Sequence, residues 1–281
     1  RWDMNGLIKE VTRAWELGVR CVVIFPKIND SLKTEDGAEC FNEDGLIPKA
    51  IRILKKEIPE MAIMTDVALD PYSCDGHDGL VDENGQILND ETIEILKKQA
   101  LAQAAAGADF IGPSDMMDGR VGAIRTALDS QGFVDVGIIS YTAKYSSAYY
   151  GPFRTALDSA PRENSKKIIP DNKSTYQMDP SNSKEALIES ALDQYEGADI
   201  LMVKPGISYL DIVYRLSTFS NKPIAAYNVS GEYSMVKSAA MKNWINEKDI
   251  VLETLLSFKR AGAKLILTYH ACDASQWLQD T

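Results

Sequence analysis

Two lysines stand at or just beyond the end of a short apolar run. Lys204 directly follows the run at 200–203, and Lys144 lies three residues beyond the run at 136–141. A lysine at the end of a buried strand loses solvation, which favours its neutral amine, and a second ammonium nearby lowers its pKa further. A neutral amine can attack a carbonyl carbon and form a Schiff base. The alternative for either lysine is a side chain that extends past the strand end into water.

Other polar side chains also follow the apolar runs. They are Asp66, Ser114, Asp115, Ser230 and Tyr269. In a parallel barrel, catalytic side chains lie at the C-terminal ends of the strands. If the runs form such a barrel, these groups and the two lysines converge on one mouth. Two lysines at similar positions on neighbouring units then favour a covalent role.

The segment after the second apolar run, residues 66–79, is rich in aspartate. It contains Asp66, Asp70, Asp75 and Asp78. Carboxylate oxygens are suitable ligands for a hard cation. The spacing itself favours a solvated loop whose aspartates form turns. The Asp-x-Asp-x-Asp-Gly spacing of an EF-hand is absent.

A long polar stretch, residues 161–183, follows the fourth run. A connection of this length is often a lid, and the alternative is a disordered insertion. Basic residues gather in it and before it: Arg154, Lys166, Lys167 and Lys173. On an acidic protein this group predicts an anionic substrate such as a carboxylate, whereas a solvated run of charges is the alternative.

Seven short apolar runs alternate with amphipathic helical stretches. The runs are 21–25, 61–65, 109–112, 136–141, 200–203, 224–227 and 265–268. Their shortness and largely apolar character predict strands that are buried on both faces. Apolar stripes predict helices that pack on the sheet, with Ile93, Leu96, Ala100 and Ala104 in one, Leu187, Ile188, Ala191 and Leu192 in a second, and Val251, Leu252, Leu255 and Leu256 in a third. Glycines are expected to end the helices before several strands, at Gly18, Gly107, Gly197 and Gly262.

The repeated helix–glycine–strand unit implies parallel strands with right-handed crossovers. With seven strands and a helix first, the chain is expected to be an α/β protein, a (β/α)8 TIM barrel. Its first strand is expected upstream, because the chain opens with Arg1 and not Met. A doubly wound open sheet is the main rival. Residues 1–281 are expected to form a single catalytic barrel domain.

The composition argues against several classes of function. The chain has 41 Asp and Glu against 30 Lys and Arg, a net charge of −11. It therefore lacks the basic surface that binding to nucleic acid or to an anionic membrane needs, and no apolar run is long enough to span a bilayer. No GxGxxG or Walker motif supports nucleotide binding. Four scattered cysteines indicate free thiols, and two histidines argue against a histidine-rich zinc site.

Several longer motifs occur in the segments at 114–121 (SDMMDGRV), 140–145 (SYTAKY), 150–154 (YGPFR), 202–206 (MVKPG), 209–212 (YLDI) and 229–232 (VSGE). In these motifs and their order, the chain closely resembles the δ-aminolevulinic acid dehydratases, or porphobilinogen synthases, over essentially its whole length. The resemblance implies a lyase that condenses two 5-aminolevulinate molecules into porphobilinogen with loss of two waters, in tetrapyrrole (heme and chlorophyll) biosynthesis.

The resemblance also implies roles for single residues. Lys204 is expected to form the Schiff base with the P-side substrate, which binds first, and Lys144 with the A-side substrate. The implied P-side carboxylate ligands are Ser230 and Tyr269, the A-side ligands are Arg154, Lys173 and Gln177, and the residues that line the pocket are Asp66, Ser114 and Asp115.

Zinc-dependent members of the family carry three cysteines in the loop after the second run, where this chain has Ala68, Asp70 and Asp78. The resemblance therefore implies the magnesium-type branch, with Mg²⁺ and not zinc, and Asp70 and Asp78 as candidate ligands. Glu189 resembles the ligand of an allosteric Mg²⁺ between subunits, although alone it would be a solvated helix carboxylate. The resemblance also implies an N-terminal arm, expected upstream of Arg1, and a homo-octamer, with dimers and hexamers as further forms. A cytoplasmic or plastid stromal location is also expected.

Two other functions stay open on sequence alone. A Schiff-base lyase of the class I aldolase type would need one imine-forming lysine. A non-catalytic barrel that binds a ligand or partner would need none. Single substitutions of Lys144 and Lys204 separate the first alternative from the dehydratase, and borohydride trapping of substrate separates the second.

Overall fold

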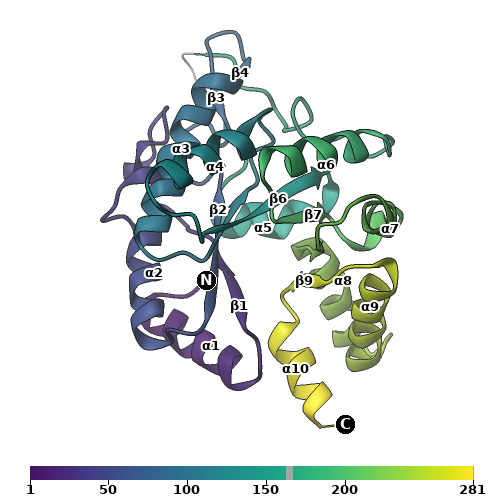
Figure 1. The fold of residues 1–281 in the computed structure, drawn as a ribbon. Helices are drawn as coiled ribbons and strands as arrows, with labels where there is room; N and C mark the ends of the chain where they lie inside the picture. The colour runs from purple at the N-terminus through teal and green to yellow at the C-terminus, as the bar shows by residue number, and fades with distance from the viewer. Residues whose placement is uncertain (163–166, 281) are drawn as a thin grey trace.

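The computed structural model describes residues 1–162 and 167–280 (Figure 1). Seven parallel strands form one sheet in the order β1-β2-β5-β6-β7-β8-β9. Their bounds are Cys21–Ile24 (β1), Ala62–Val67 (β2), Phe110–Pro113 (β5), Gly137–Lys144 (β6), Ile200–Lys204 (β7), Ile224–Asn228 (β8) and Leu265–Thr268 (β9). All seven predicted strands are confirmed, with ends shifted by up to three residues.

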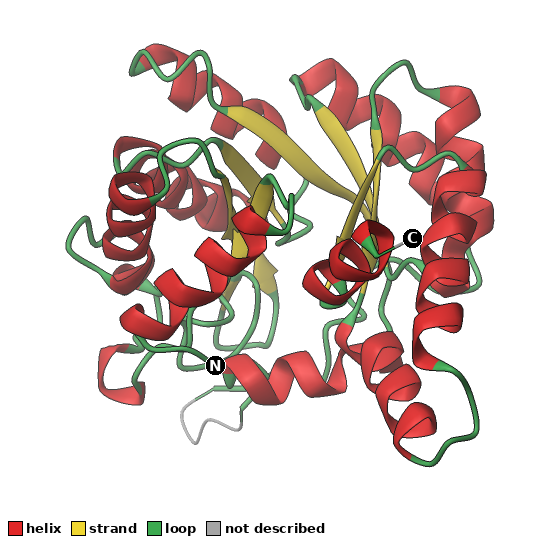
Figure 2. Ribbon diagram, turned by 90° about the horizontal axis from the view of Figure 1, so that it is seen from below, coloured by secondary structure: helices red, strands yellow, loops and turns green. Residues whose placement is uncertain are grey.

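The strand order follows the chain order without a reversal. A doubly wound sheet reverses its order at a switch point, so that rival is wrong. Within the described residues β1 and β9 are the two edges, and the curled sheet of seven strands matches the expected barrel fold. Figure 2 shows the helices arranged around the strands.

The helices that connect the strands cover the outside of the sheet. Their bounds are Met4–Glu16 (α1), Leu46–Glu57 (α2), Asn89–Ala105 (α3), Arg120–Ser130 (α4), Gly151–Leu157 (α5), Glu185–Glu196 (α6), Leu210–Phe219 (α7), Ser230–Met241 (α8), Glu247–Ala261 (α9) and Ala271–Gln279 (α10). The four glycines predicted to end helices all have positive φ, between 93° and 109°. Among the described residues, no helix combines the length and apolarity that crossing a membrane requires.

The predicted stripe of α3 is buried, but the stripe of α6 is not. Ile188 and Leu192 are 63% and 48% exposed, whereas Ser190 and Asp193 are buried. The prediction was wrong here because the inner face of α6 carries polar side chains that meet polar groups of the sheet. Leu256 of α9 is likewise exposed.

The small antiparallel hairpin of β3 (Leu80–Val81) and β4 (Ile87–Leu88) was not predicted. Strands of two residues carry no readable periodicity. The core has two parts. A small cluster that includes Met64, Tyr141 and Tyr227 is separate from the larger cluster to which the helices contribute.

Candidate active site

The two lysines lie at the ends of neighbouring strands. Lys144 is the last residue of β6 and Lys204 the last of β7, and the two are register partners in the parallel pair. Both are buried, at 6% and 5% exposure. Lys144 was expected beyond its strand, but β6 continues to it because its polar residues, including Ser140 and Thr142, are also buried.

Aromatic rings surround the ammonium of Lys204. The nitrogen lies 4.8 to 5.3 Å from four ring centroids, those of Tyr141, Tyr150, Phe153 and Tyr227. Burial, and next the charge of Lys144, lower the pKa of Lys204 to about 7. A large share of this amine is therefore neutral near pH 7, which is the form that attacks a carbonyl.

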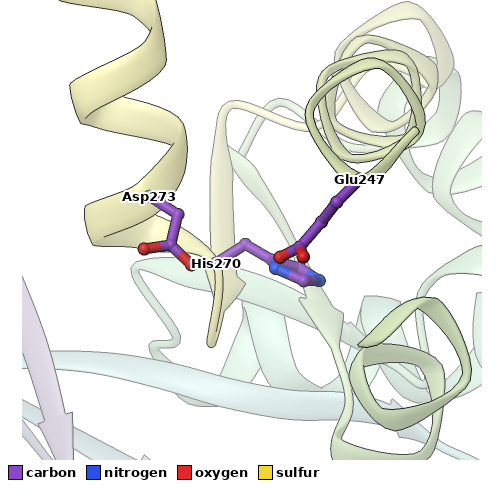
Figure 3. Close-up of side chains that lie close together, drawn as sticks. All are labelled: Glu247, His270 and Asp273. Carbon is purple, nitrogen blue, oxygen red and sulfur yellow. The ribbon is translucent and has the colours of Figure 1, made fainter. Parts of the chain in front are cut away.

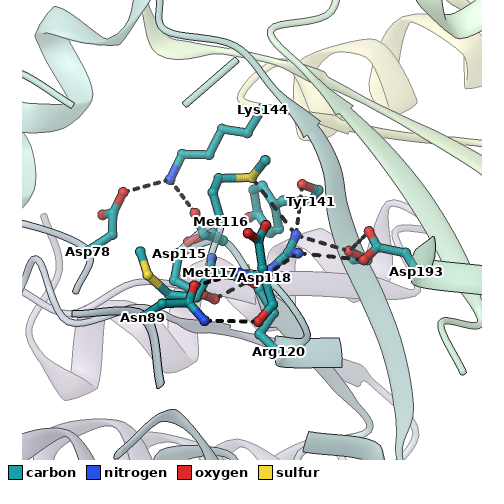
Figure 4. Close-up of polar contacts among 12 residues, drawn as sticks. Asp78, Asn89, Asp115, Met116, Met117, Asp118, Arg120, Tyr141, Lys144 and Asp193 are labelled. Atoms are coloured by element: carbon teal, nitrogen blue, oxygen red, sulfur yellow. Dashed lines mark hydrogen bonds and ion pairs between the residues drawn. The ribbon is translucent and has the colours of Figure 1, made fainter. Parts of the chain in front are cut away.

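Lys144 has polar partners instead. Its nitrogen lies 3.2 Å from Asp78 Oδ2 and donates to the Ser114 carbonyl (Figure 4). The nitrogen of Lys173 lies 2.9 Å from the other Asp78 oxygen and 3.0 Å from Asp70. Burial alone would raise the pKa of Asp78, but the charges of Lys144 and Lys173 hold it below its usual range.

Asp66 and Asp70 behave differently from Asp78. Burial, and next the charge of Asp70, raise the pKa of Asp66 to about 7. Burial also raises the pKa of Asp70, against the opposing effect of Lys173. Asp66 Oδ1 has no hydrogen-bond partner within the described part of the chain. Asp66 is therefore a half-buried residue whose carboxyl can take up or release a proton near neutral pH.

Asp115 follows β5 and fixes a tight turn. Its Oδ2 accepts a 2.8 Å hydrogen bond from the Met117 amide, and Met116 between them has a φ of 69°. Left-handed backbone is uncommon outside glycine and clusters at functional sites. Burial raises the pKa of Asp115 to about 6, against the charge of Arg120.

The fully buried Arg120 connects this turn to α6. Its guanidinium lies 3.8 Å from Asp115, 3.0 Å from Glu189 and 3.5 Å from Asp193 (Figure 4). We did not assign a role to Arg120 or Asp193 from the sequence. The available signal was an arginine among apolar residues of α4, next to the SDMMDG segment.

The residues expected on the P-side border the aromatic cage of Lys204. Ser230 begins α8 and its Oγ accepts a 3.1 Å hydrogen bond from the Phe153 amide. Tyr269 is 45% exposed, with its ring centroid 6.5 Å from that of Tyr227. Each therefore contacts a residue of the cage, and the structure brings both near Lys204.

Of the residues expected on the A-side, Lys173 lies beside Lys144, since both contact Asp78. The Met178 amide donates to the Lys144 carbonyl at 3.0 Å, so the described part of the long polar stretch packs on β6. The Gln177 amide bonds the Lys173 carbonyl at 3.0 Å. Arg154 lies on α5, with its guanidinium carbon 5.8 Å from the Tyr150 ring centroid.

The predicted basic group is not one cluster of free cations. Lys173 is paired with two aspartates, and Lys167 pairs with Asp75 and donates to the Val81 carbonyl. Lys166 lies outside the described residues. Of the four, Arg154 and Lys173 stay candidates for binding a carboxylate.

The residues expected to hold metal already have partners. The ammonium of Lys173 contacts both Asp70 and Asp78, and Glu189 is ion-paired with Arg120. Carboxylate oxygens suit a hard cation such as Mg²⁺, but Lys173 would have to move to admit one. The metal ligands stay predictions.

Comparison with known proteins agrees with this geometry. The model of the family described as "Delta-aminolevulinic acid dehydratase" matches residues 1–277. Chloroplastic delta-aminolevulinic acid dehydratases of Physcomitrium patens and Chlamydomonas reinhardtii are 59% and 58% identical over 274 and 275 residues, 98% of this chain in each case. The chain spans 62% of the first relative and 70% of the second.

Solved structures give the same result. The delta-aminolevulinic acid dehydratase of Toxoplasma gondii, solved with the reaction product porphobilinogen, is 51% identical with a TM-score of 0.96, covering all of this chain and 79% of its own. An aldolase called QR15 has a TM-score of 0.54 at 11% identity, over 99% of this chain and 90% of its own, and shares the fold alone. The chain belongs to the delta-aminolevulinic acid dehydratase family.

Proposed function

We propose that this protein is a porphobilinogen synthase, a lyase of tetrapyrrole biosynthesis that condenses two molecules of 5-aminolevulinate through Schiff bases on Lys204 and Lys144. The observation that carries the proposal is the pair of buried lysines in register at the ends of β6 and β7. An aldolase of the single-lysine type has no use for the second amine, and a binding protein has no use for either. Family membership supports the same reaction.

The reaction balances without an oxidant or reductant. Each lysine forms an imine with a substrate ketone and releases one water. The carbon next to the imine on Lys144 loses a proton and bonds to the imine carbon on Lys204. The amino group of the P-side substrate then bonds to the imine carbon on Lys144. Both lysines leave as amines, and loss of the remaining protons gives the pyrrole.

The surroundings of each lysine support this division of roles. The pKa of Lys204, about 7, supplies a neutral amine for the first imine. Asp66, whose pKa is also about 7, is the proposed proton carrier between the two substrates, because a carboxyl with a pKa near the working pH both accepts and donates. Asp115 and Ser114 complete the pocket beside Lys144.

The carboxylates of the two substrates would be bound on opposite sides. Ser230 and Tyr269 are the proposed ligands on the side of Lys204. Arg154, Lys173 and Gln177 are the proposed ligands on the side of Lys144. Lys173 would then exchange an aspartate contact for the substrate carboxylate.

Three further properties are part of the proposal. The enzyme would be of the magnesium type, with Asp70 and Asp78 as candidate ligands in the active site and Glu189 as the ligand of an allosteric ion. When bound, Mg²⁺ would supply positive charge and ordered water. The enzyme would assemble as a homo-octamer, and the chloroplastic names of the plant and algal relatives support a plastid stromal location.

The first experiment is to incubate the folded protein with 5-aminolevulinate, with added Mg²⁺ or with EDTA, and to measure porphobilinogen with a pyrrole-specific colour reagent. We expect product that rises with Mg²⁺ and survives a zinc-selective chelator. Borohydride should trap substrate on Lys204 and Lys144, as located by peptide mass spectrometry. No pyrrole and no trapped adduct from a folded sample would overturn the proposal, and an adduct on one lysine alone, without pyrrole, would favour the aldolase alternative.

A further inference from the structure

A second cluster of titratable side chains lies at the junction of α9, β9 and α10. Glu247 is the first residue of α9, His270 immediately precedes α10, and Asp273 is in the first turn of α10. One nitrogen or oxygen atom from each lies within 4.8 Å of the other two (Figure 3). None of these residues has a place in the proposed condensation.

His270 carries the unexplained feature of this cluster. The residue is 3% exposed, and its Nδ1 has no hydrogen-bond partner within the described part of the chain. Buried imidazole nitrogens are normally paired, so an orphaned one calls for an explanation. Figure 3 shows the ring beside the Glu247 carboxylate, with Asp273 approaching from α10. Burial, and next the charge of Lys237, lower the pKa of His270, which keeps the imidazole neutral.

The two carboxylates already attract a cation. The ammonium of Lys237 on α8 is hydrogen-bonded to Glu247 Oε1 and lies 3.4 Å from Asp273 Oδ2. The other Asp273 oxygen lies 3.9 Å from Arg13. The side chain of Lys237 is 31% exposed, so its long stem can carry the ammonium into water without unfolding α8.

We propose that Glu247, His270 and Asp273 bind a divalent transition-metal ion of the Zn²⁺ or Co²⁺ type, which displaces the ammonium of Lys237. One imidazole nitrogen and two carboxylate oxygens form a donor set that these ions accept. Bonds of about 2.0–2.2 Å to a tetrahedral ion place donor atoms about 3.4 Å apart, so a small rotation of the side chains closes the present spacing. Water would complete the fourth position. The ion would link α9 to α10.

The test is a titration of the purified full chain with Co²⁺, followed by its visible absorption and by calorimetry. We expect this site to bind one Co²⁺ per chain. His270→Ala and Glu247→Gln should each weaken that binding about 100-fold. The matched control Glu253→Gln removes the same charge from an exposed position of α9 and should leave the affinity unchanged.

Lys237 provides an independent test that does not remove a ligand. Lys237→Met should tighten Co²⁺ binding about fivefold, since an ammonium no longer competes for the carboxylates. Lys259→Met, at an exposed position of α9, is the control for loss of a positive charge. Equal binding by His270→Ala and the wild type would overturn the proposal. If His270→Ala does not fold, Lys237→Met that binds no tighter than Lys259→Met overturns it instead.

Discussion

Lys144 and Lys204 occupy matching positions on neighbouring strands, yet their surroundings differ in kind. Lys204 faces four aromatic rings, whereas Lys144 contacts the Asp78 carboxylate and the Ser114 carbonyl. Ring faces attract a cation but replace only part of its hydration, so the pKa of Lys204 falls to about 7. Lys144 has no such cage, and its nitrogen lies 3.2 Å from a carboxylate oxygen.

The difference implies an order of events. In the proposed reaction, Lys204 needs no change of partner before it attacks a ketone. Lys144 must first leave its contact with Asp78, a carboxylate that Lys173 also contacts. We infer that the first substrate reacts at Lys204 and that the second, through its carboxylate, draws Lys173 away from Asp78 and frees Lys144.

The largest expected effect comes from removing either amine. Lys204→Ala and Lys144→Ala should each lower porphobilinogen formation by about 10⁴-fold, and the double variant should be little worse, because the two residues act as a unit. Trapping of substrate with borohydride should distinguish the two single variants. Lys144→Ala should still yield a borohydride-stable adduct on Lys204, whereas Lys204→Ala should yield almost none on Lys144. Equal trapping in both variants would contradict the proposed order.

The contact between Lys144 and the carboxylate of Asp78 can be removed by substituting Asp78. Asp78→Asn leaves two buried ammonium groups without their shared carboxylate, and we expect the free energy of unfolding at pH 7 to fall by about 3 kcal/mol. Asp70→Asn is the matched control. It should cost clearly less, because burial already raises the pKa of Asp70 and its charge contributes less to folding. Urea unfolding measures both, and equal losses would show that Asp78 has no special role.

The aromatic cage of Lys204 can be disrupted by substituting Phe153. Below a pKa of about 7, Lys204 is mostly charged, so the rate of imine trapping should fall about tenfold per pH unit on the acid side. Phe153→Ser admits water to the cage and favours the ammonium form of Lys204. The acid side of the pH profile of trapping should therefore move to higher pH by about one unit. Phe219→Ser, on the exposed end of α7, should leave the pH profile unchanged. An unchanged profile in Phe153→Ser would mean that the cage does not set the pKa of Lys204.

Stability should report the same depressed pKa. A lysine with a folded pKa of about 7 and an unfolded value of about 10.4 binds fewer protons in the folded state between these limits. Unfolding then takes up a proton, so this residue makes the protein more stable as the pH rises from 7 to 10. Over that range, the free energy of unfolding of the wild type should increase relative to that of Lys204→Met by on the order of 1 kcal/mol per pH unit. A constant difference across the range would contradict the depressed pKa.

The strands and the lysines were predictable because their signals are local. A buried parallel strand is a short apolar run, and a polar residue directly after it lies at the mouth of a barrel. The aromatic cage of Lys204 was not predictable in this way. The cage combines three segments, with Tyr141 on β6, Tyr227 on β8, and Tyr150 and Phe153 at the start of α5. Their convergence depends on how three strands and a helix pack.

The same limit explains the errors on α6. An apolar stripe predicts the inner face of a helix when the facing surface is apolar. Here the facing surface offers Ser140 and Arg120, so Asp193 points inward and Ile188 outward. The resemblance to a family identified Glu189 as a ligand, but only the structure shows that it pairs with an arginine behind the active site.

The smallest expected effect concerns that arginine. Glu189→Gln removes one of three carboxylates around Arg120, and Asp193 and Asp115 remain, so the free energy of unfolding should fall by only about 1 kcal/mol. Its consequence should be larger at one of the two lysines. Arg120 contacts the side chain of Asp115, in the turn beside Lys144, whereas its contact with the cage of Lys204 is a hydrogen bond to the Tyr141 carbonyl and does not involve the ring. We expect trapping at Lys144, and any activation by Mg²⁺, to fall while the pH profile of trapping at Lys204 is unchanged. If both lysines respond equally, the two sites are not separate in the way that their partners indicate.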